Sequence, residues 1–94
     1  MSPTNTDQEL PLTELARGVI ARVSAIRAGP AEQALALRLV ELGFIEGEPL
    51  RVVAFGYPGR DPIGVRLGGR GGAGSFALRR KEASLVWVRR EVAA

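Results

Sequence analysis

Apolar and polar residues alternate with a period of two in several short segments, which is the pattern of half-buried β-strands. In residues 63–67 the alternation is clean, because three branched aliphatic side chains are separated by Gly64 and Arg66. Residues 50–55 show the same pattern after Pro49, whose fixed φ suits the start of an extended segment. Further strands are predicted at residues 19–26, 75–79 and 85–88.

One segment has the period of a helix instead. Residues 31–42 are good helix formers, and Pro30 suits the first helical position because its missing N–H would be unpaired there. Leucines recur at i, i+4 and i+7 and form the stripe expected to be buried, which comprises Leu35, Leu39 and Leu42. Leu37 and Val40 widen this apolar face, so we expect the helix to be well covered.

The predicted helix ends abruptly. Gly43 can adopt the left-handed conformation that ends a helix, and Gly47 allows a second reversal four residues later. Phe44 lies just beyond the stop and is expected to pack back on the helix as a hydrophobic cap. The helix therefore leads directly into the strand at residues 50–55, which limits the architecture to a helix that feeds a small sheet.

The ends and connections complete one small domain over residues 11–90. Residues 1–10 are polar and unpatterned and predict a disordered tail. Short helical turns are expected at residues 11–17 and 80–83, and a glycine-rich loop at residues 68–74. One helix accompanied by several short, closely spaced strands predicts a mainly β fold, a small barrel rather than a βαβ sheet.

Length and composition narrow the class of protein. A chain of 94 residues with 46% apolar residues forms one globular domain with a modest core. The chain has no cysteine, whereas a small secreted domain would usually need disulfides. The first residues lack the basic and apolar regions of a signal peptide, and no apolar run approaches the ~20 residues of a membrane span. We therefore expect a soluble, cytoplasmic protein without membrane insertion.

The residue inventory argues against catalysis and against a bound metal or cofactor. The chain has no His and no Cys, which removes the commonest general base, the thiol nucleophile and the usual ligands for zinc, ferrous iron and copper. Residues 69–74 match G-x-G-x-x-G literally. A dinucleotide site needs a helix after this motif, however, and the residues that follow predict a strand.

The positive charge comes almost entirely from arginine. The formal net charge is +3, and Lys81 is the single lysine. Arginines are spread along the chain, with tight basic clusters only at residues 79–81 and 89–90, so a solvated surface is favoured over a polyanion site. Three of them are candidates for charge complementarity with a partner: Arg79, Arg80 and Arg89.

Trp87 is the strongest candidate for a contact anchor. If Val86 and Val88 face the core, period-two alternation sends Leu85 and Trp87 to the opposite face, where they would form an exposed apolar pair. The alternative is a shifted register that buries Trp87. Tyr57, on a turn, is a weaker candidate of the same kind. An exposed strand could also pair with a second copy, so weak homo-oligomerisation stays open.

Several short motifs occur in a fixed order between residues 12 and 88. They are Leu12-x-x-Leu15-x-x-Gly18, Leu39-x-x-Leu42-Gly43-Phe44-x-x-Gly47, Asp61-Pro62-Ile63 and Ala77-Leu78-Arg79-Arg80-x-Glu82-Ala83-x-x-Val86-x-Val88. In this order and spacing they resemble the ferrous iron transport protein A (FeoA-like) family. The resemblance implies an SH3-like β-barrel with one α-helix inserted after the first strand, and a family association with transition metal ions.

The resemblance also implies a function. It describes a cytoplasmic accessory or regulatory protein of bacterial ferrous iron uptake, without catalysis of its own. Such a protein would bind the cytosolic part of a membrane-embedded, GTP-hydrolysing iron transporter as a protein-interaction module. The predicted contact surface comprises Leu85, Trp87, Arg79, Arg80, Arg89 and Tyr57. The alternative is a nucleic-acid-binding SH3-like barrel, which would use the same arginines and lose affinity steeply with salt.

Overall fold

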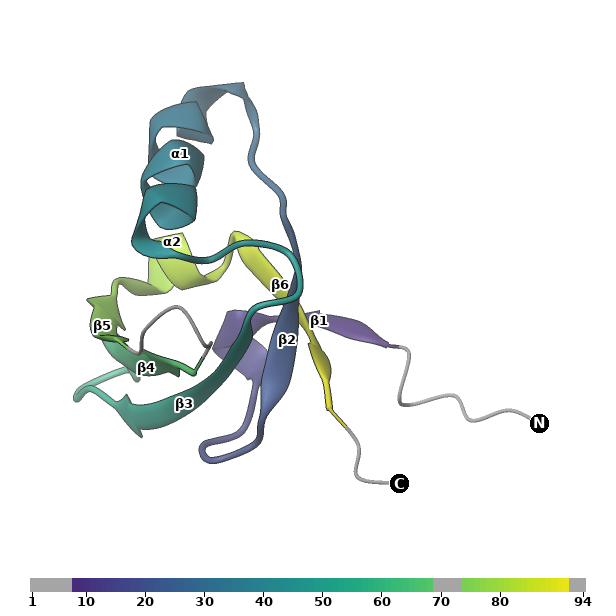
Figure 1. Cartoon of the computed structure of the whole chain (residues 1–94). Helices are drawn as coiled ribbons and strands as arrows, with labels where there is room; N and C mark the ends of the chain where they lie inside the picture. The colour runs from purple at the N-terminus through teal and green to yellow at the C-terminus, as the bar shows by residue number, and fades with distance from the viewer. Residues whose placement is uncertain (1–7, 69–73, 92–94) are drawn as a thin grey trace.

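The described part of the protein contains six short strands and little helix. The structure is a computed structural model and describes residues 8–68 and 74–91. The strands are β1 (Glu9–Pro11), β2 (Ala21–Ile26), β3 (Pro49–Phe55), β4 (Ile63–Leu67), β5 (Gly74–Leu78) and β6 (Val86–Arg90). The helical segments are the 3-10 turns η2 (Leu12–Glu14) and η3 (Pro30–Glu32) and the α-helices α1 (Gln33–Leu42) and α2 (Arg80–Ala83) (Figure 1). Every predicted strand is present, with its ends shifted by at most two residues.

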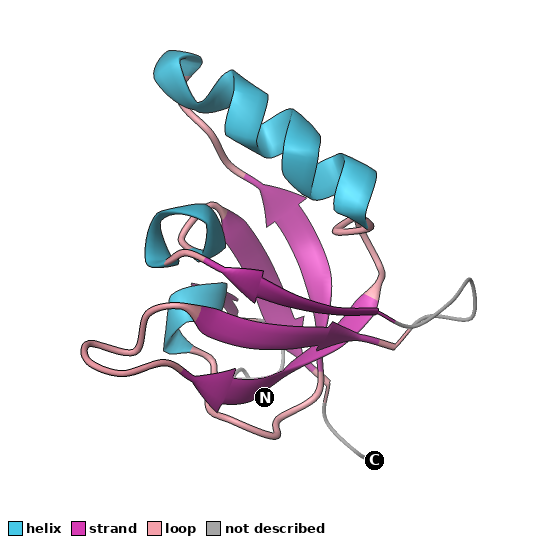
Figure 2. Ribbon diagram, turned by 90° about the vertical axis from the view of Figure 1, so that its left-hand side faces the viewer, coloured by secondary structure: helices cyan, strands magenta, loops and turns pink. Residues whose placement is uncertain are grey.

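The described strands form one antiparallel sheet in the order β1-β6-β2-β3-β4-β5. Strands β3, β4 and β5 are consecutive neighbours, whereas β6 returns to lie between β1 and β2. The sheet is strongly curved, and α1, inserted between β2 and β3, lies across one end of it (Figures 1 and 2). This arrangement confirms the predicted mainly β fold with one inserted helix.

The concave face of the sheet holds the core. Apolar residues of β2, β3, β4 and β6 point inward at alternate positions, as their burial patterns show. The largest fully buried side chains are Phe44, Leu12, Leu15, Leu39, Ile63, Val52, Val65, Val86 and Val88. In the described part of the chain no polar or charged side chain is buried, so the core is held together by apolar contacts.

Helix α1 is less covered than its sequence suggests. Leu39 is buried, and Leu35 and Leu42 pack partly against the core, as predicted for the stripe. Leu37 and Val40, however, are 60% and 45% exposed, so the expectation of a well-covered helix is wrong. The reason is geometric: a helix placed across one end of the sheet contacts it along a single stripe.

The predicted helix stop at Gly43 is confirmed. Gly43 has φ +118°, and its N–H donates to the Val40 carbonyl at 3.0 Å. The Phe44 N–H donates to the Leu39 carbonyl, also at 3.0 Å, and the Phe44 side chain is fully buried. Gly47 provides the second reversal with φ +90°. The chain therefore turns back under α1 and enters β3.

Strand β1 corrects the predicted tail. Residues 1–10 were expected to be disordered, but Glu9 and Leu10 belong to β1 and pair with Arg89 and Val88 of β6. Three residues are too few to show an alternating pattern, so this pairing has no local sequence signal. Residues 1–7 of the predicted tail and residues 69–73 of the predicted glycine loop lie outside the described residues.

Candidate interaction surface

Trp87 lies on the outer face of the sheet. Its neighbours in β6, Val86 and Val88, are fully buried, and the alternation sends the Trp87 ring to the opposite side. The ring is half-buried and lies beside Pro11 of β1 and Ala25 of β2, its partners on the two flanking strands. The structure thus agrees with the outward register of Trp87 and disagrees with the alternative in which it is a core residue.

Leu85 does not accompany Trp87. Its side chain is only 5% exposed and belongs to the core cluster, so the expected exposed pair of Leu85 and Trp87 is wrong. Leu85 precedes β6 and lies in the turn that follows α2, where its N–H donates to the Glu82 carbonyl. Period-two alternation holds only within a strand, and therefore it does not apply across this boundary.

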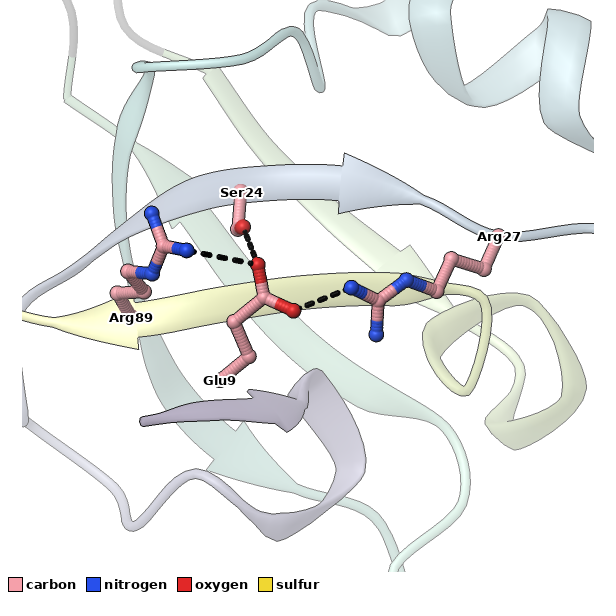
Figure 3. A network of polar contacts seen from close by, with 4 residues as sticks. All are labelled: Glu9, Ser24, Arg27 and Arg89. Atoms are coloured by element: carbon pink, nitrogen blue, oxygen red, sulfur yellow. Dashed lines mark hydrogen bonds and ion pairs between the residues drawn. The ribbon is translucent and has the colours of Figure 1, made fainter. Parts of the chain in front are cut away.

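Glu9 brings together residues from four segments on this face. Its carboxylate accepts a hydrogen bond from the Ser24 hydroxyl of β2 and forms an ion pair with Arg27, just beyond β2 (Figure 3). The same carboxylate lies 3.2 Å from a guanidinium nitrogen of Arg89 on β6. Arg27 also lies over the Trp87 ring, with its guanidinium carbon 4.5 Å from the ring centroid. The cluster Glu9, Ser24, Arg27, Trp87 and Arg89 is called the Glu9 cluster below.

The environment of Glu9 favours its ionised form. The hydrogen bond from Ser24 lowers the pKa of the Glu9 carboxyl most, and the Arg27 guanidinium lowers it further. The Glu9 side chain is 20% exposed, whereas those of Arg27 and Arg89 are about half exposed. The carboxylate therefore fixes β1 to the sheet, while the half-exposed guanidinium groups of Arg27 and Arg89 remain accessible from solvent.

The other predicted contact residues form a second group, at the start of α2. The Arg79 N–H donates to the Glu82 carboxylate at 2.8 Å, and the Arg80 N–H donates to Asp61 at 2.9 Å. Asp61 lies in the loop between β3 and β4, which also carries Tyr57, so this bond ties the loop to α2. The Arg79 and Arg80 side chains are exposed, and Tyr57 is 95% exposed.

Two members of the Glu9 cluster, Trp87 and Arg89, are among the contact residues predicted from the sequence, whereas Glu9, Ser24 and Arg27 are not. Glu9 lies in the segment predicted as a disordered tail, and its interactions depend on the pairing of β1 with β6 across most of the chain length. Ser24 and Arg27 have only a weak sequence signal for a role at the surface, namely that both are polar residues at the end of a predicted strand. The arrangement offers arginines, a half-buried aromatic ring and a carboxylate on one face, which suits recognition of a protein surface.

Among the residues that the structure describes, no three Asp or Glu side chains gather as metal ligands would. The chain has no His or Cys to complete such a set. Within the same residues, no helix is both long and apolar enough to span a bilayer.

A small, curved antiparallel sheet with one inserted helix defines the class of SH3-like barrel domains, and comparison with known proteins agrees. Residues 10–90 match the family model of the FeoA domain. Because the match covers most of the chain, the protein belongs to the FeoA family, as its motifs suggested. No curated protein sequence matches the chain.

Solved FeoA structures are similar in both sequence and fold. FeoA of Stenotrophomonas maltophilia, solved in complex with zinc, is 39% identical, with a TM-score of 0.73, over 90% of this chain and 99% of that one. It is described as an SH3-domain protein and a candidate activating factor of bacterial ferrous iron transport. FeoA of Chlorobium tepidum is 33% identical, with a TM-score of 0.68, over 90% of this chain and 73% of that one.

The fold extends beyond the family. A manganese-dependent transcriptional repressor is 20% identical, with a TM-score of 0.74, over 95% of this chain and 39% of the repressor. At this identity the likeness concerns the fold alone.

Proposed function

We propose that this protein is a cytoplasmic accessory protein of bacterial ferrous iron uptake and acts as a protein-interaction module. The observation that carries the proposal is the match to the FeoA domain over residues 10–90. Its target, on this proposal, is the cytosolic part of a membrane-embedded, GTP-hydrolysing iron transporter. The protein would modulate that partner without catalysing a reaction itself.

The outer face of the sheet supports a binding role. Trp87 supplies a large aromatic surface of the type that dominates the binding energy of protein interfaces. Arg27 and Arg89 lie around it and could bind carboxylates of a partner. Tyr57 and the arginines at the start of α2 provide a second exposed group. On this proposal Trp87 is the central contact, and the second group lies at the periphery.

The test is direct binding of the purified full chain to the cytosolic GTP-binding portion of the transporter, measured by calorimetry. The titration is done without nucleotide, with GDP and with a non-hydrolysable GTP analogue. We expect saturable binding, and a difference between the nucleotide states would show which state the protein recognises.

The controls separate a failed partner from a failed protein. Circular dichroism and thermal melting show whether both proteins are folded before the titration. If both are folded and no heat of binding appears in any nucleotide state, the proposed partner is wrong. If replacement of Trp87 leaves the affinity unchanged, the proposed partner is right but the proposed contact surface is wrong.

A further inference from the structure

Two pairs of arginines lie directly opposite each other on the outer face of the sheet. Arg22 of β2 is opposite Arg89 of β6, and Arg51 of β3 is opposite Arg66 of β4. Both pairs share one face, because Arg22 is also opposite Pro49, which lies two residues before Arg51 on β3. Like charges directly opposite on neighbouring strands are destabilising, so each pair needs a compensating group.

The first pair is neutralised by the protein itself. Arg22 forms an ion pair with Glu91 at 3.1 Å, and Arg89 forms one with Glu9 at 3.2 Å. The second pair has no such partner: in residues 8–68 and 74–91, no carboxylate forms an ion pair with Arg51 or Arg66, and neither side chain donates a hydrogen bond. Both side chains are exposed.

The second pair borders a hollow of about 180 Å³ in the protein surface. Its lining consists of Ile20, Pro49, Leu50, Arg51, Arg66 and Gly68. The hollow is smaller than the roughly 300–1,000 Å³ of typical small-molecule sites, so it suits one or two amino-acid side chains rather than a cofactor. Ile20, which is 47% exposed, and Pro49 give it an apolar wall beside the two charges.

We propose that Arg51 and Arg66 form a carboxylate-binding site for an acidic segment of a partner protein, with an apolar side chain of the same segment in the hollow against Ile20. The pair Arg22 and Arg89 shows the kind of group that such a pair takes, since glutamate carboxylates neutralise it. Guanidinium groups bind carboxylates in bidentate geometry. The proposal rests on the proposed function, and it adds the chemistry of the partner segment.

The lining favours a peptide over a nucleic acid. Single-stranded nucleic acids are bound by stacking of bases on aromatic side chains along a basic groove. The hollow has no aromatic residue in its lining, and its apolar wall would be left uncovered by a phosphate. An acidic peptide with alternating apolar residues covers both parts of the site.

The first experiment is an NMR titration of the full ¹⁵N-labelled chain with an end-blocked peptide of sequence Glu-Leu-Glu-Leu-Glu. We expect saturable shifts at Ile20, Arg51 and Arg66. Arg51→Gln and Arg66→Gln should each weaken binding about tenfold or more, because each removes a charge-assisted hydrogen bond. The matched control is Arg38→Gln, which changes the net charge equally on the exposed side of α1 and should alter affinity less than about twofold.

Several outcomes would overturn the proposal. One is the absence of saturable shifts at millimolar peptide, and another is equal binding of the peptide Gln-Leu-Gln-Leu-Gln. Equal weakening by Arg38→Gln would indicate diffuse charge instead of a site. Tighter binding of oligothymidylate at the same residues would assign the pair to a nucleic acid. A lower melting temperature of both arginine variants would mean that Arg51 and Arg66 stabilise the fold instead of forming a binding site. Because each substitution removes the repulsion between the two charges, we expect an unchanged or higher melting temperature.

The same variants separate this proposal from the proposed function. If the transporter portion binds the wild-type chain and both arginine variants equally, the carboxylate site is wrong as a partner contact, and the proposed function stands. If the acidic peptide binds but the transporter portion does not, the site stands and the proposed partner fails.

Discussion

Arg27 covers one side of Trp87: its guanidinium carbon lies 4.5 Å from the ring centroid, and Glu9 binds the same guanidinium. The aromatic ring is therefore connected to strand β1 through a cation–π contact and an ion pair. This connection joins β1, which has no local sequence signal, to Trp87, the strongest contact candidate in the sequence. Both interactions lie on the outer face, where a partner would meet them.

The emission of Trp87 should report on Arg27. Trp87 is the single tryptophan of the chain, so the fluorescence has one source. Arg27→Gln removes the cover from the ring and should shift its emission to longer wavelength, with a stability loss of roughly 0.5–1 kcal/mol. The control is Arg60→Gln, which removes the contact of Arg60 with Phe55, whose ring centroid is 4.0 Å away. An identical spectrum in the Arg27 variant would mean that Arg27 does not cover Trp87 in solution.

The Glu9 cluster should make stability depend on pH in the acid range. The pKa of Glu9 is lowered in the folded protein, so its stabilisation is fully present above the ordinary pKa of an unfolded glutamate and is lost as the pH falls through the lower folded value. Glu9→Gln should therefore melt at a lower temperature than wild type at neutral pH, and the difference should shrink in acid.

Thermal melts at a series of pH values check the pH dependence at Glu9. Glu14→Gln is the matched control, because Glu14 is exposed and has no ion pair within the described residues. A difference between wild type and Glu9→Gln that persists below the folded pKa would show that the carboxylate charge is not what holds β1.

The helix stop should tolerate no side chain at Gly43. With φ +118°, Gly43→Ala is strained, and the new Cβ would lie 3.0 Å from Leu67 Cδ1. We expect a loss of about 1–3 kcal/mol in the free energy of unfolding, measured by urea denaturation. Gly68→Ala is the control: its φ is ordinary and its Cβ would meet nothing within 4 Å among the described residues, so the change should stay within about 0.5 kcal/mol. Equal effects of the two substitutions would refute the argument.

These examples show what the sequence can and cannot predict. Local rules sufficed for strands β2 to β6 and for the helix stop, because alternation and the conformational freedom of Gly43 act over a few neighbouring residues. The pairing of Glu9 with Arg89 depends on two segments at opposite ends of the chain. No local pattern contains that information.

The same limit applies to the arginine pairs. Arg66 is an outward residue of one predicted strand and Arg51 lies in another, but their direct opposition depends on the register of β3 and β4. The predicted exposure of Leu85 is wrong for a different reason: Leu85 lies before β6 begins, and alternation holds only within the strand. Outward direction was thus predictable, whereas the neighbour across the sheet was not.

The burial of Leu85 predicts a large cost for its truncation. Leu85→Ala should lower the free energy of unfolding by about 2–5 kcal/mol, the range for buried leucines. Leu37→Ala provides the matched control, because Leu37 is 60% exposed on α1 and alanine is the better helix former, so its effect should be within about 0.5 kcal/mol. Urea denaturation of both variants measures the difference. If Leu85→Ala lowers the free energy of unfolding only slightly, Leu85 would again be a candidate for a surface contact.

Trp87 should matter for binding more than for folding. Its ring is half-buried on the outer face, and the core beneath is filled by Val86 and Val88, so Trp87→Ala should leave the domain folded with a lower melting temperature. As a central aromatic contact it should weaken binding to the transporter portion on the order of 30-fold, or about 2 kcal/mol. Calorimetry with Trp87→Ala and Trp87→Phe measures this effect, and the phenylalanine variant should recover part of the affinity. If Trp87→Ala unfolds the domain, the ring acts as a structural residue. If the variant is folded and binds like wild type, the partner uses another face, and the arginines at the start of α2 become the next candidates.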